Sequence, residues 1–169
     1  METREFFEAL EKNFGKAIHP IEDQNGGKFI SIGVERDSLK KVLEFCAADS
    51  SLRFDFLENM IGIDAGQELQ IIYRLVSLSL VHTLNLKVSV DRHSPKMPSA
   101  HETWKAAIYY ELEIAEMLGI SFQGHPEPRK LLLPEDWQGF PLRKDYTFPE
   151  EYHSIEHRRA PLRKEHTRP

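Results

Sequence analysis

The sequence predicts an α+β fold, a two-layer arrangement with helices on one face of a sheet, followed by a long extended C-terminal docking segment. Three strand-like patterns follow one another between residues 52 and 90, with no helical pattern between them. Helical patterns come before and after these strands, and from residue 119 onward the chain has no regular period. Adjacent strands favour a sheet covered by helices on one face over a doubly wound fold.

The N-terminal part predicts a helix, a strand and a second helix. Apolar residues recur at helical spacing before Gly15, which would end the first helix: Phe6, Phe7, Leu10 and Phe14. The segment "KFISIGV" alternates as a strand does and follows "NGG" at 25–27, which reads as a hairpin turn. Asp37 is expected to cap the second helix. The apolar face of that helix would consist of Leu39, Val42, Leu43 and Cys46.

Residues 52–64, 69–78 and 84–90 predict three successive strands. The last has the clearest alternation, because its apolar and polar residues fall on opposite faces. The apolar face comprises Leu84, Leu86, Val88 and Val90.

A third helix is predicted between Pro98 and Gly119. Ser99 and Glu102 have the spacing of a capping box, and Gly119 is a suitable C-terminal stop. The expected buried stripe consists of Trp104, Ile108, Leu112 and Ala115. The acidic residues of the remaining surface are interpreted as solvated: Glu102, Glu111, Glu113 and Glu116.

The segment "FQGHPEPRKLLLPEDWQGFPLRKDY", residues 122–146, is long for a loop, and long loops are usually functional or disordered. Disordered tails are poor in aromatic and aliphatic residues, whereas residues 120–152 are rich in both. We therefore expect an ordered, extended segment that packs on its own domain or on another protein. The predicted division is a domain at 1–118, the extended segment at 119–152 and a basic tail at 153–169. Without its partner, the chain from about Leu142 onward is expected to be mobile.

Charge and cysteine content exclude several classes of protein. Residues 1–142 have a net negative charge and residues 143–169 a net positive charge. A nucleic-acid-binding protein would instead carry a basic face on its folded domain. The single Cys46 excludes an internal disulfide and a cluster or zinc site built from several thiolates of this chain. We expect no cofactor in this chain. The start "METREFFEALEKN" does not resemble a signal peptide, and the longest apolar run is interrupted by Arg74, so a cytoplasmic or peripheral location is expected.

Few residues suggest catalysis. "NGGKF" lacks the spacing of a phosphate-binding loop, and no nucleophile motif of hydrolases occurs. His153 and His157 lie four residues apart with Glu156 between them, which permits a metal site but is more typical of a solvated turn. His125, in "GHPEPR", is interpreted as a hydrogen-bonding residue that fixes the loop. Glu135 and Asp136 are interpreted as turn residues after Pro134.

The stretch "GISFQGHPEPRKLLLPEDWQGFPLRKDY" strongly resembles the signature of the C subunit of proton-pumping NADH:quinone oxidoreductase, respiratory complex I. That family typically reads G-I-x-F-x-G-H-P-D-L-R-R-I-L, followed by D-W-x-G-x-P-L-R-K-D-Y. The chain departs from the family at Leu112, where an arginine is usual, at Leu118 in place of a phenylalanine, and at Glu127 and Pro128 in place of D-L. An aspartate of the family pattern is replaced by Glu116 or Ala115.

The resemblance implies a non-catalytic subunit of the hydrophilic arm, on the cytoplasmic side of the inner membrane, that contacts the membrane only through the complex. Its partners would be the large quinone-site subunit, which is hydrogenase-like, and neighbouring iron–sulfur subunits. The implied interface residues are His125, Pro126, Arg129, Trp137, Pro141, Arg143, Lys144, Asp145 and Tyr146. The partners of Arg143 and Lys144 are expected on another chain. Two alternatives stay open: the equivalent subunit of a membrane-bound nickel–iron hydrogenase, and a stand-alone metal-dependent enzyme using His125, His153 and His157.

Overall fold

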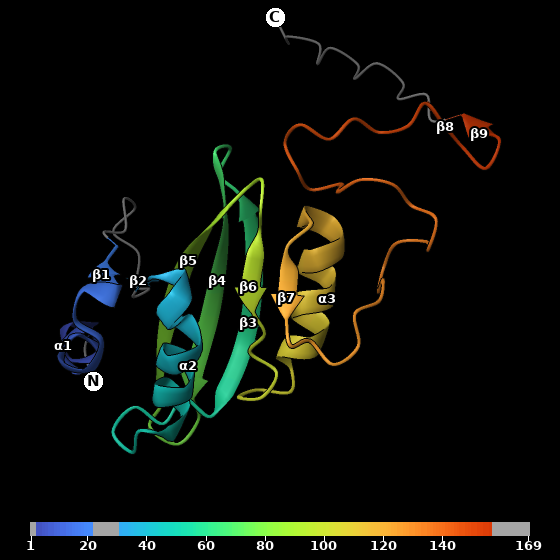
Figure 1. The fold of residues 1–169 in the computed structure, drawn as a ribbon. Coiled ribbons are helices and arrows are strands. Elements are labelled where there is room, and N and C mark those ends of the chain that lie inside the picture. Colours follow the sequence, from blue (N-terminus) through green and yellow to red (C-terminus); the bar gives the residue numbers. More distant parts are fainter. Residues whose placement is uncertain (1–2, 22–30, 157–169) are drawn as a thin grey trace, which may run out of the picture.

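The computed structural model describes residues 3–21 and 31–156, which form a sheet with helices and a long segment that wraps around the last helix (Figure 1). Helix α1 spans Thr3–Phe14, α2 spans Leu39–Ala48 and α3 spans Ala107–Leu118, with short 3-10 turns at Gly15–Ala17 and Arg36–Ser38. The sheet has the strand order β1-β2-β5-β4-β3. Its strands are β1 Ile18–Pro20, β2 Ser31–Val34, β3 Phe56–Asp64, β4 Glu68–Ser77 and β5 His82–Asp91.

The three successive strands that the sequence predicts are present, and in the structure they form an antiparallel meander. Ile71 of β4 lies opposite Val88 of β5, and Gly62 of β3 lies opposite Ile71 on the other side. The predicted apolar face of β5 is buried: Leu84, Leu86, Val88 and Val90. Strand β2 adds to the outer edge of β5 in parallel, with Ile32 opposite Leu86. The strand at residues 31–34 is therefore confirmed, whereas the expected turn at 25–27 lies outside the described residues.

All three helices contribute to one core on one face of the sheet. The predicted apolar face of α2 is buried: Leu39, Val42, Leu43 and Cys46. In α1, Phe6 and Leu10 are fully buried, and the Phe6 ring lies 5.6 Å from that of Phe54. Helix α3 packs on β3 at Gly62, where an added Cβ would lie 2.5 Å from Leu118 Cδ1. The α+β fold with helices on one face is thus confirmed.

Two helix-capping predictions are wrong. Asp37 lies in the 3-10 turn before α2, and its carboxylate accepts hydrogen bonds from the Arg36 guanidinium instead of capping the helix. Ser99 does not begin α3, which starts at Ala107, because the Ser99 hydroxyl donates to the Glu111 carboxylate at 2.5 Å. A carboxylate from the helix thus recruits the residue that local spacing assigns to its cap.

The prediction of which α3 residues are buried and which are exposed is also wrong in part. Trp104 is buried but precedes the helix, and its indole Nε1 donates to Phe54 O at 3.1 Å. The residues that the helix buries include two of the acidic positions expected in solvent. They are Ala107, Glu111, Leu112, Ile114, Glu116 and Leu118. Buried carboxylates need hydrogen-bond donors, so Glu111 and Glu116 point to parts of the chain that supply them.

Four short strands lie in the segments without regular sequence patterns. Strand β6, Lys96–Pro98, pairs in parallel with β7, Ser121–Gln123, beside α3 (Figure 1). Strands β8, Glu151–Tyr152, and β9, Ile155–Glu156, form a hairpin that stands away from the large sheet. No helix among the described residues is long and apolar enough to span a bilayer.

Candidate partner interface

The extended segment begins where α3 ends at Gly119. This glycine has a φ of 76°, and its N–H donates to Ala115 O at 2.8 Å, which closes the last helical turn. The ring of Phe140 returns to cover it: a Cβ on Gly119 would lie 2.6 Å from Phe140 Cε2. Both the left-handed backbone and the close ring require glycine here.

His125 fixes the first part of the segment, as interpreted from the sequence. Its Nε2 lies 3.0 Å from Ile108 O, in the first turn of α3, and its Nδ1 accepts the Glu127 N–H at 3.1 Å. With Nδ1 as the acceptor of the Glu127 N–H, Nε2–H is the donor to the helix carbonyl. Pro126 lies between the two bonded residues and restricts the backbone there.

Glu116 holds the middle of the segment. Its two carboxylate oxygens accept the N–H groups of Leu131, Leu132 and Leu133 at 3.0, 2.8 and 3.2 Å. The side chain lies in the last turn of α3, and the residue is only 7% exposed. Charge-assisted bonds from three successive backbone groups compensate for burial of this carboxylate.

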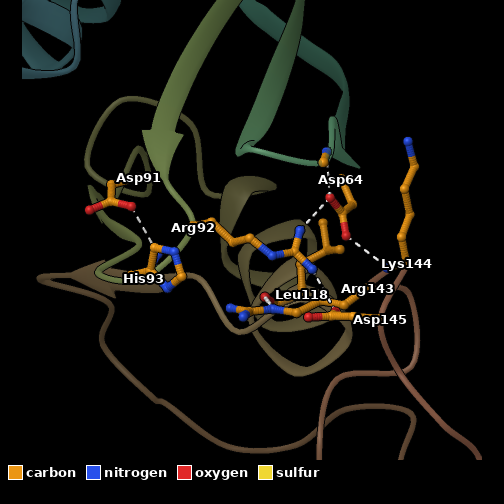
Figure 2. A network of polar contacts seen from close by, with 9 residues as sticks. Asp64, Asp91, Arg92, His93, Leu118, Arg143, Lys144 and Asp145 are labelled. Atoms are coloured by element: carbon orange, nitrogen blue, oxygen red, sulfur yellow. Dashed lines mark hydrogen bonds and ion pairs between the residues drawn. The ribbon is translucent and has the colours of Figure 1, made fainter.

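Asp64, at the end of β3, binds the extended segment near Lys144 and Asp145 (Figure 2). Asp64 Oδ1 accepts Arg92 Nη1 at 2.5 Å and Gly66 N at 2.8 Å, while Oδ2 accepts the Lys144 N–H at 2.7 Å. Arg92 also donates through Nη2 to Asp145 Oδ1 at 2.5 Å. The Arg92 guanidinium lowers the pKa of the Asp64 carboxyl, and the N–H groups of Lys144 and Gly66 add to this effect.

Arg143 binds its own domain, so the expectation that its partners lie on another chain is wrong for Nε. Arg143 Nε donates to Leu118 O at 2.7 Å, and its guanidinium carbon lies 4.8 Å from the centre of the Phe140 ring. The neighbouring Leu142 N–H donates to Met117 O at 3.1 Å. Together these donors satisfy carbonyls at the C-terminal end of α3, which has no intrahelical donor for them.

Beyond Asp145, the segment packs on itself. Trp137 lies 5.2 Å from Tyr152 and 6.3 Å from Phe148, measured between ring centres, and Phe148 lies 5.0 Å from Tyr146. Asp136 accepts the Tyr152 hydroxyl and His153 Nε2, each at 2.7 Å, and these donors lower its pKa, His153 most. The turn expected at Glu135 and Asp136 is confirmed, since the Trp137 N–H donates to Pro134 O at 3.1 Å, and the Asp136 carboxylate in addition cross-links two loops.

The sequence of the chain is similar to that of known proteins over most of its length. The model of the family described as respiratory-chain NADH dehydrogenase, 30 kDa subunit, matches residues 32–152. The chain belongs to this family. The match covers both the sheet domain and the extended segment, so the 30 kDa subunit family includes the signature residues described above.

Several relatives share substantial sequence identity with this family member, and each is named as the C subunit of NADH-quinone oxidoreductase. The protein of Chloroherpeton thalassium is 34% identical over 88% of this chain and 62% of its own length. That of Roseiflexus sp. is 43% identical over 69% of this chain and 68% of its own length. That of Chlorobium phaeobacteroides is 34% identical over 88% of this chain and 91% of its own length. The chain therefore spans about two thirds of two of these relatives and most of the third.

Two solved structures share the fold. The trypsin-resistant fragment of Nqo5 superimposes with a TM-score of 0.61 at 22% identity, over 75% of this chain and 99% of the fragment. A chain of a membrane-bound sulfane sulfur reductase, an archaeal respiratory membrane complex, superimposes with a TM-score of 0.67 at 17% identity, over 85% of each chain. At these identities the likeness concerns the fold alone.

The residues predicted for the interface of this 30 kDa subunit family member lie in three places in the structure. Trp137 and Tyr146 belong to the distal aromatic group, where the Tyr146 hydroxyl donates to Gln138 O at 3.2 Å. His125 and Arg129 line a pocket of about 250 Å³ beside α3, together with Phe122 and Pro128. Pro141 precedes the Leu142–Asp145 stretch that lies on the end of α3 and β3.

Sequence reasoning missed the residues that receive this segment: Asp64, Arg92 and Glu116. Asp64 stands in the "GID" motif at the end of a predicted strand. A carboxylate directly after the run "MIGI" at 60–63, which has no polar side chain, was the signal for a buried acceptor.

The histidines considered for a metal site have protein partners. His125 bonds Ile108 and Glu127, His153 bonds Asp136, and His157 lies outside the described residues. Within residues 3–21 and 31–156, no group of three His, Cys, Asp or Glu side chains is placed to hold a metal ion.

The buried carboxyl of Glu111 should make the stability of the chain depend on pH. It is fully buried, accepts Ser99 Oγ at 2.5 Å and Ala100 N at 2.6 Å, and burial raises its pKa. A raised folded-state pKa contributes stability below the unfolded pKa of about 4.3, which is lost as pH rises toward the folded pKa. In Glu111→Gln, we therefore expect urea midpoints to fall less between pH 4 and pH 7 than in the native chain.

Glu113→Gln is the matched control for this measurement, because Glu113 lies two residues away and is exposed. It should keep the native pH dependence. The same pH dependence in Glu111→Gln and in the native chain would contradict the assigned role of the buried carboxyl.

Proposed function

We propose that this chain is a non-catalytic subunit of the hydrophilic arm of NADH:quinone oxidoreductase. It assembles with and supports the large quinone-site subunit while electrons pass from NADH to quinone, coupled to proton translocation. The observation that carries the proposal is the family match over residues 32–152, together with relatives 34–43% identical that are all named as the C subunit of this enzyme. The relatives' names favour this reading over the equivalent hydrogenase subunit.

A scaffold role agrees with how the chain uses its ionisable groups. Glu116, Asp64 and His125 each bind backbone groups of their own chain, which is how structural polar residues behave. The single Cys46 is buried, and burial raises its pKa, which disfavours the reactive thiolate. We propose that the chain itself carries no catalytic residue and no cofactor.

The proposed partners are the large hydrogenase-like subunit and neighbouring iron–sulfur subunits on the cytoplasmic side of the inner membrane. The chain would reach the membrane only through the complex. Within the proposed role, the segment from His125 to Tyr146 supplies the contact surface, because it exposes apolar side chains while its backbone is bound to α3 and β3.

Co-purification tests this function. An affinity-tagged chain, expressed in its own host and extracted with mild detergent from membranes, should recover iron–sulfur subunits and NADH:quinone reductase activity. The same chain purified alone should show no visible absorption and no stoichiometric metal. Recovery of hydrogenase subunits, or a chromophore retained by the isolated chain through gel filtration, would overturn the proposal.

A further inference from the structure

We propose that the Ser99 hydroxyl couples the buried Glu111 carboxyl to the partly exposed imidazole of His101, so that protons enter and leave this part of the core through the three residues. In this relay, the ionisation of Glu111 decides which ring nitrogen of a neutral His101 carries the hydrogen. The relay lies where residues 99–106 connect β6 to α3, and it depends neither on a partner subunit nor on the proposed function.

A continuous series of hydrogen bonds joins the three side chains. Ser99 Oγ lies 2.5 Å from Glu111 Oε2 and 3.1 Å from His101 Nδ1. Glu111 has no exposed surface, Ser99 is buried, and His101 is partly exposed. The series therefore runs from a fully buried carboxyl to a group that can exchange protons with water.

Ser99 has one hydroxyl hydrogen and two neighbours that can accept it. If Ser99 donates to Glu111, His101 must carry a hydrogen on Nδ1 in order to bond the hydroxyl oxygen. If Ser99 donates to His101 Nδ1, the Glu111 carboxyl must be protonated on Oε2 and donate to Ser99. The Ala100 N–H donates to Glu111 Oε1 at 2.6 Å and is compatible with both arrangements, because it binds the other carboxyl oxygen.

A proton moves along this series without any change in the number of bonds. The Glu111 Oε2–H bond breaks as a new Ser99 Oγ–H bond forms, and the original Oγ–H bond breaks as a His101 Nδ1–H bond forms. Glu111 becomes negative and His101 positive, so the total charge is unchanged. Loss of the Nε2 proton to water then leaves a neutral His101 with its hydrogen on Nδ1.

Burial of Glu111 makes the relay responsive to pH. It raises the pKa of this carboxyl, and the hydrogen bonds from Ser99 and Ala100 act in the opposite direction. The carboxyl therefore holds its proton to higher pH than an exposed glutamate does, toward the range in which an imidazole exchanges protons. Two groups that share one hydroxyl then release their protons in coupled steps.

The other ionisable groups that face Glu111 do not provide this path. Tyr73 of β4 stays protonated, because burial and the Glu111 charge raise its pKa, and its hydroxyl has no partner among the described residues. His125 engages both ring nitrogens with backbone groups. Arg129 lines the same pocket as Glu111, but it is paired with Glu127 at 3.4 Å.

The charged groups around His101 are exposed. Glu102 follows it in the sequence and is paired with Lys40 of α2 at 2.6 Å, and Lys105 lies in the same connection. Salt screens charges on such exposed side chains. The hydrogen bonds through Ser99, rather than these charges, therefore couple His101 to the buried carboxyl.

Nuclear magnetic resonance of the isolated full-length chain tests the relay. The nitrogen shifts of the His101 ring identify the nitrogen that carries the hydrogen, and the carbon shift of the Glu111 carboxyl reports its ionisation. Above the pH at which Glu111 ionises, neutral His101 should carry its hydrogen on Nδ1. A hydrogen on Nε2 beside an ionised Glu111 would overturn the relay in the native chain alone.

Glu111→Gln is the variant that mimics the protonated carboxyl. Its amide oxygen would accept the Ala100 N–H, so its NH₂ group would donate to Ser99, which would donate to His101 Nδ1. Neutral His101 should therefore carry its hydrogen on Nε2 in this variant, at the pH where the native chain carries it on Nδ1. The same tautomer in both proteins would contradict the relay.

Ser99→Ala removes the link itself. In this variant the titrations of Glu111 and His101 should become independent, and coupling that persists would show that the hydroxyl is not the connection. Should Ser99→Ala fail to fold, the native chain and Glu111→Gln still decide the matter.

Hydrogen exchange tests a further consequence of the single hydroxyl hydrogen. When Glu111 and His101 are both protonated, both donate to Ser99, whose own hydrogen then has no acceptor in the relay. On acidification to that state, the protection factor of the Ala100 amide should fall by about fivefold, as expected when one hydrogen bond of ordinary strength is lost. His101→Gln cannot take up the second proton and should not show this fall.

His93→Gln is the matched control, because His93 is exposed in the connection between β5 and β6. It should keep the native fall in protection at Ala100. An equal fall in His101→Gln and in the native chain would remove His101 from the relay and overturn the inference.

Discussion

Gly119→Ala should destabilise the chain by about 2–4 kcal/mol, because the left-handed backbone and the contact with Phe140 each oppose a side chain. Gly119 has a φ of 76°, and an added Cβ would lie 2.6 Å from two atoms of the Phe140 ring. Moving that ring would displace the stretch that returns Leu142 and Arg143 to the end of α3. The measurement is the free energy of unfolding from urea titration.

Gly124→Ala is the matched control. Gly124 has a φ of 85°, similar to that of Gly119, but an added Cβ would meet no atom within 4 Å. It should therefore show only the cost of the left-handed conformation, about 1 kcal/mol. Equal losses in the two variants would mean that the Phe140 contact contributes nothing, and that the return of the segment over Gly119 does not stabilise the chain.

The sheet could be predicted from sequence because the alternation of apolar and polar residues in a strand is a local pattern. Alternation at Leu84, Leu86, Val88 and Val90 fixes which face of β5 is buried, and neighbouring strands repeat the pattern. The start of α3 could not be predicted in this way. Ser99 has the local spacing of a cap, but its partner is Glu111, twelve residues away along the chain. A tertiary acceptor outcompetes a local one when both cannot be satisfied.

The prediction that the acidic residues of α3 are solvated was wrong for a related reason. Glu111 and Glu116 look solvated in sequence because carboxylates usually are. Their burial is partly compensated because Ala100 and residues 131–133 donate N–H groups to the two carboxylates. These N–H groups belong to loops whose sequence has no regular pattern. The pattern of residues within the helix therefore does not reveal that Glu111 and Glu116 are buried.

The extended segment could be recognised as important, but the direction of its side chains could not. Its aromatic and proline content predicts order, and its signature indicates a family. An extended loop has no fixed period, however, so sequence alone did not show that Arg143 points toward Leu118 O while Leu142 points outward. The receiving residues Asp64 and Arg92 lie about 50–80 positions earlier.

Arg143→Glu should reduce assembly of the hydrophilic arm by about tenfold or more, which corresponds to about 1.4 kcal/mol or more. The substitution removes the bond from Nε to Leu118 O and the contact with the Phe140 ring. It also places a negative charge at the C-terminal end of α3, where the helix dipole is itself negative. If a partner carboxylate faces this residue, two like charges would oppose each other at the interface.

The decisive measurement is NADH:quinone turnover per assembled complex in mutant membranes. Lys12→Glu makes the same change of charge in the last turn of α1, on an exposed residue, and should assemble normally. Because we assign no chemistry to Arg143, any Arg143→Glu complex that assembles should turn over at a near-native rate, and total activity should fall only in proportion to assembly. Full assembly with lost turnover would place Arg143 in the reaction itself, since a contact residue controls how many complexes form and not how fast each one works.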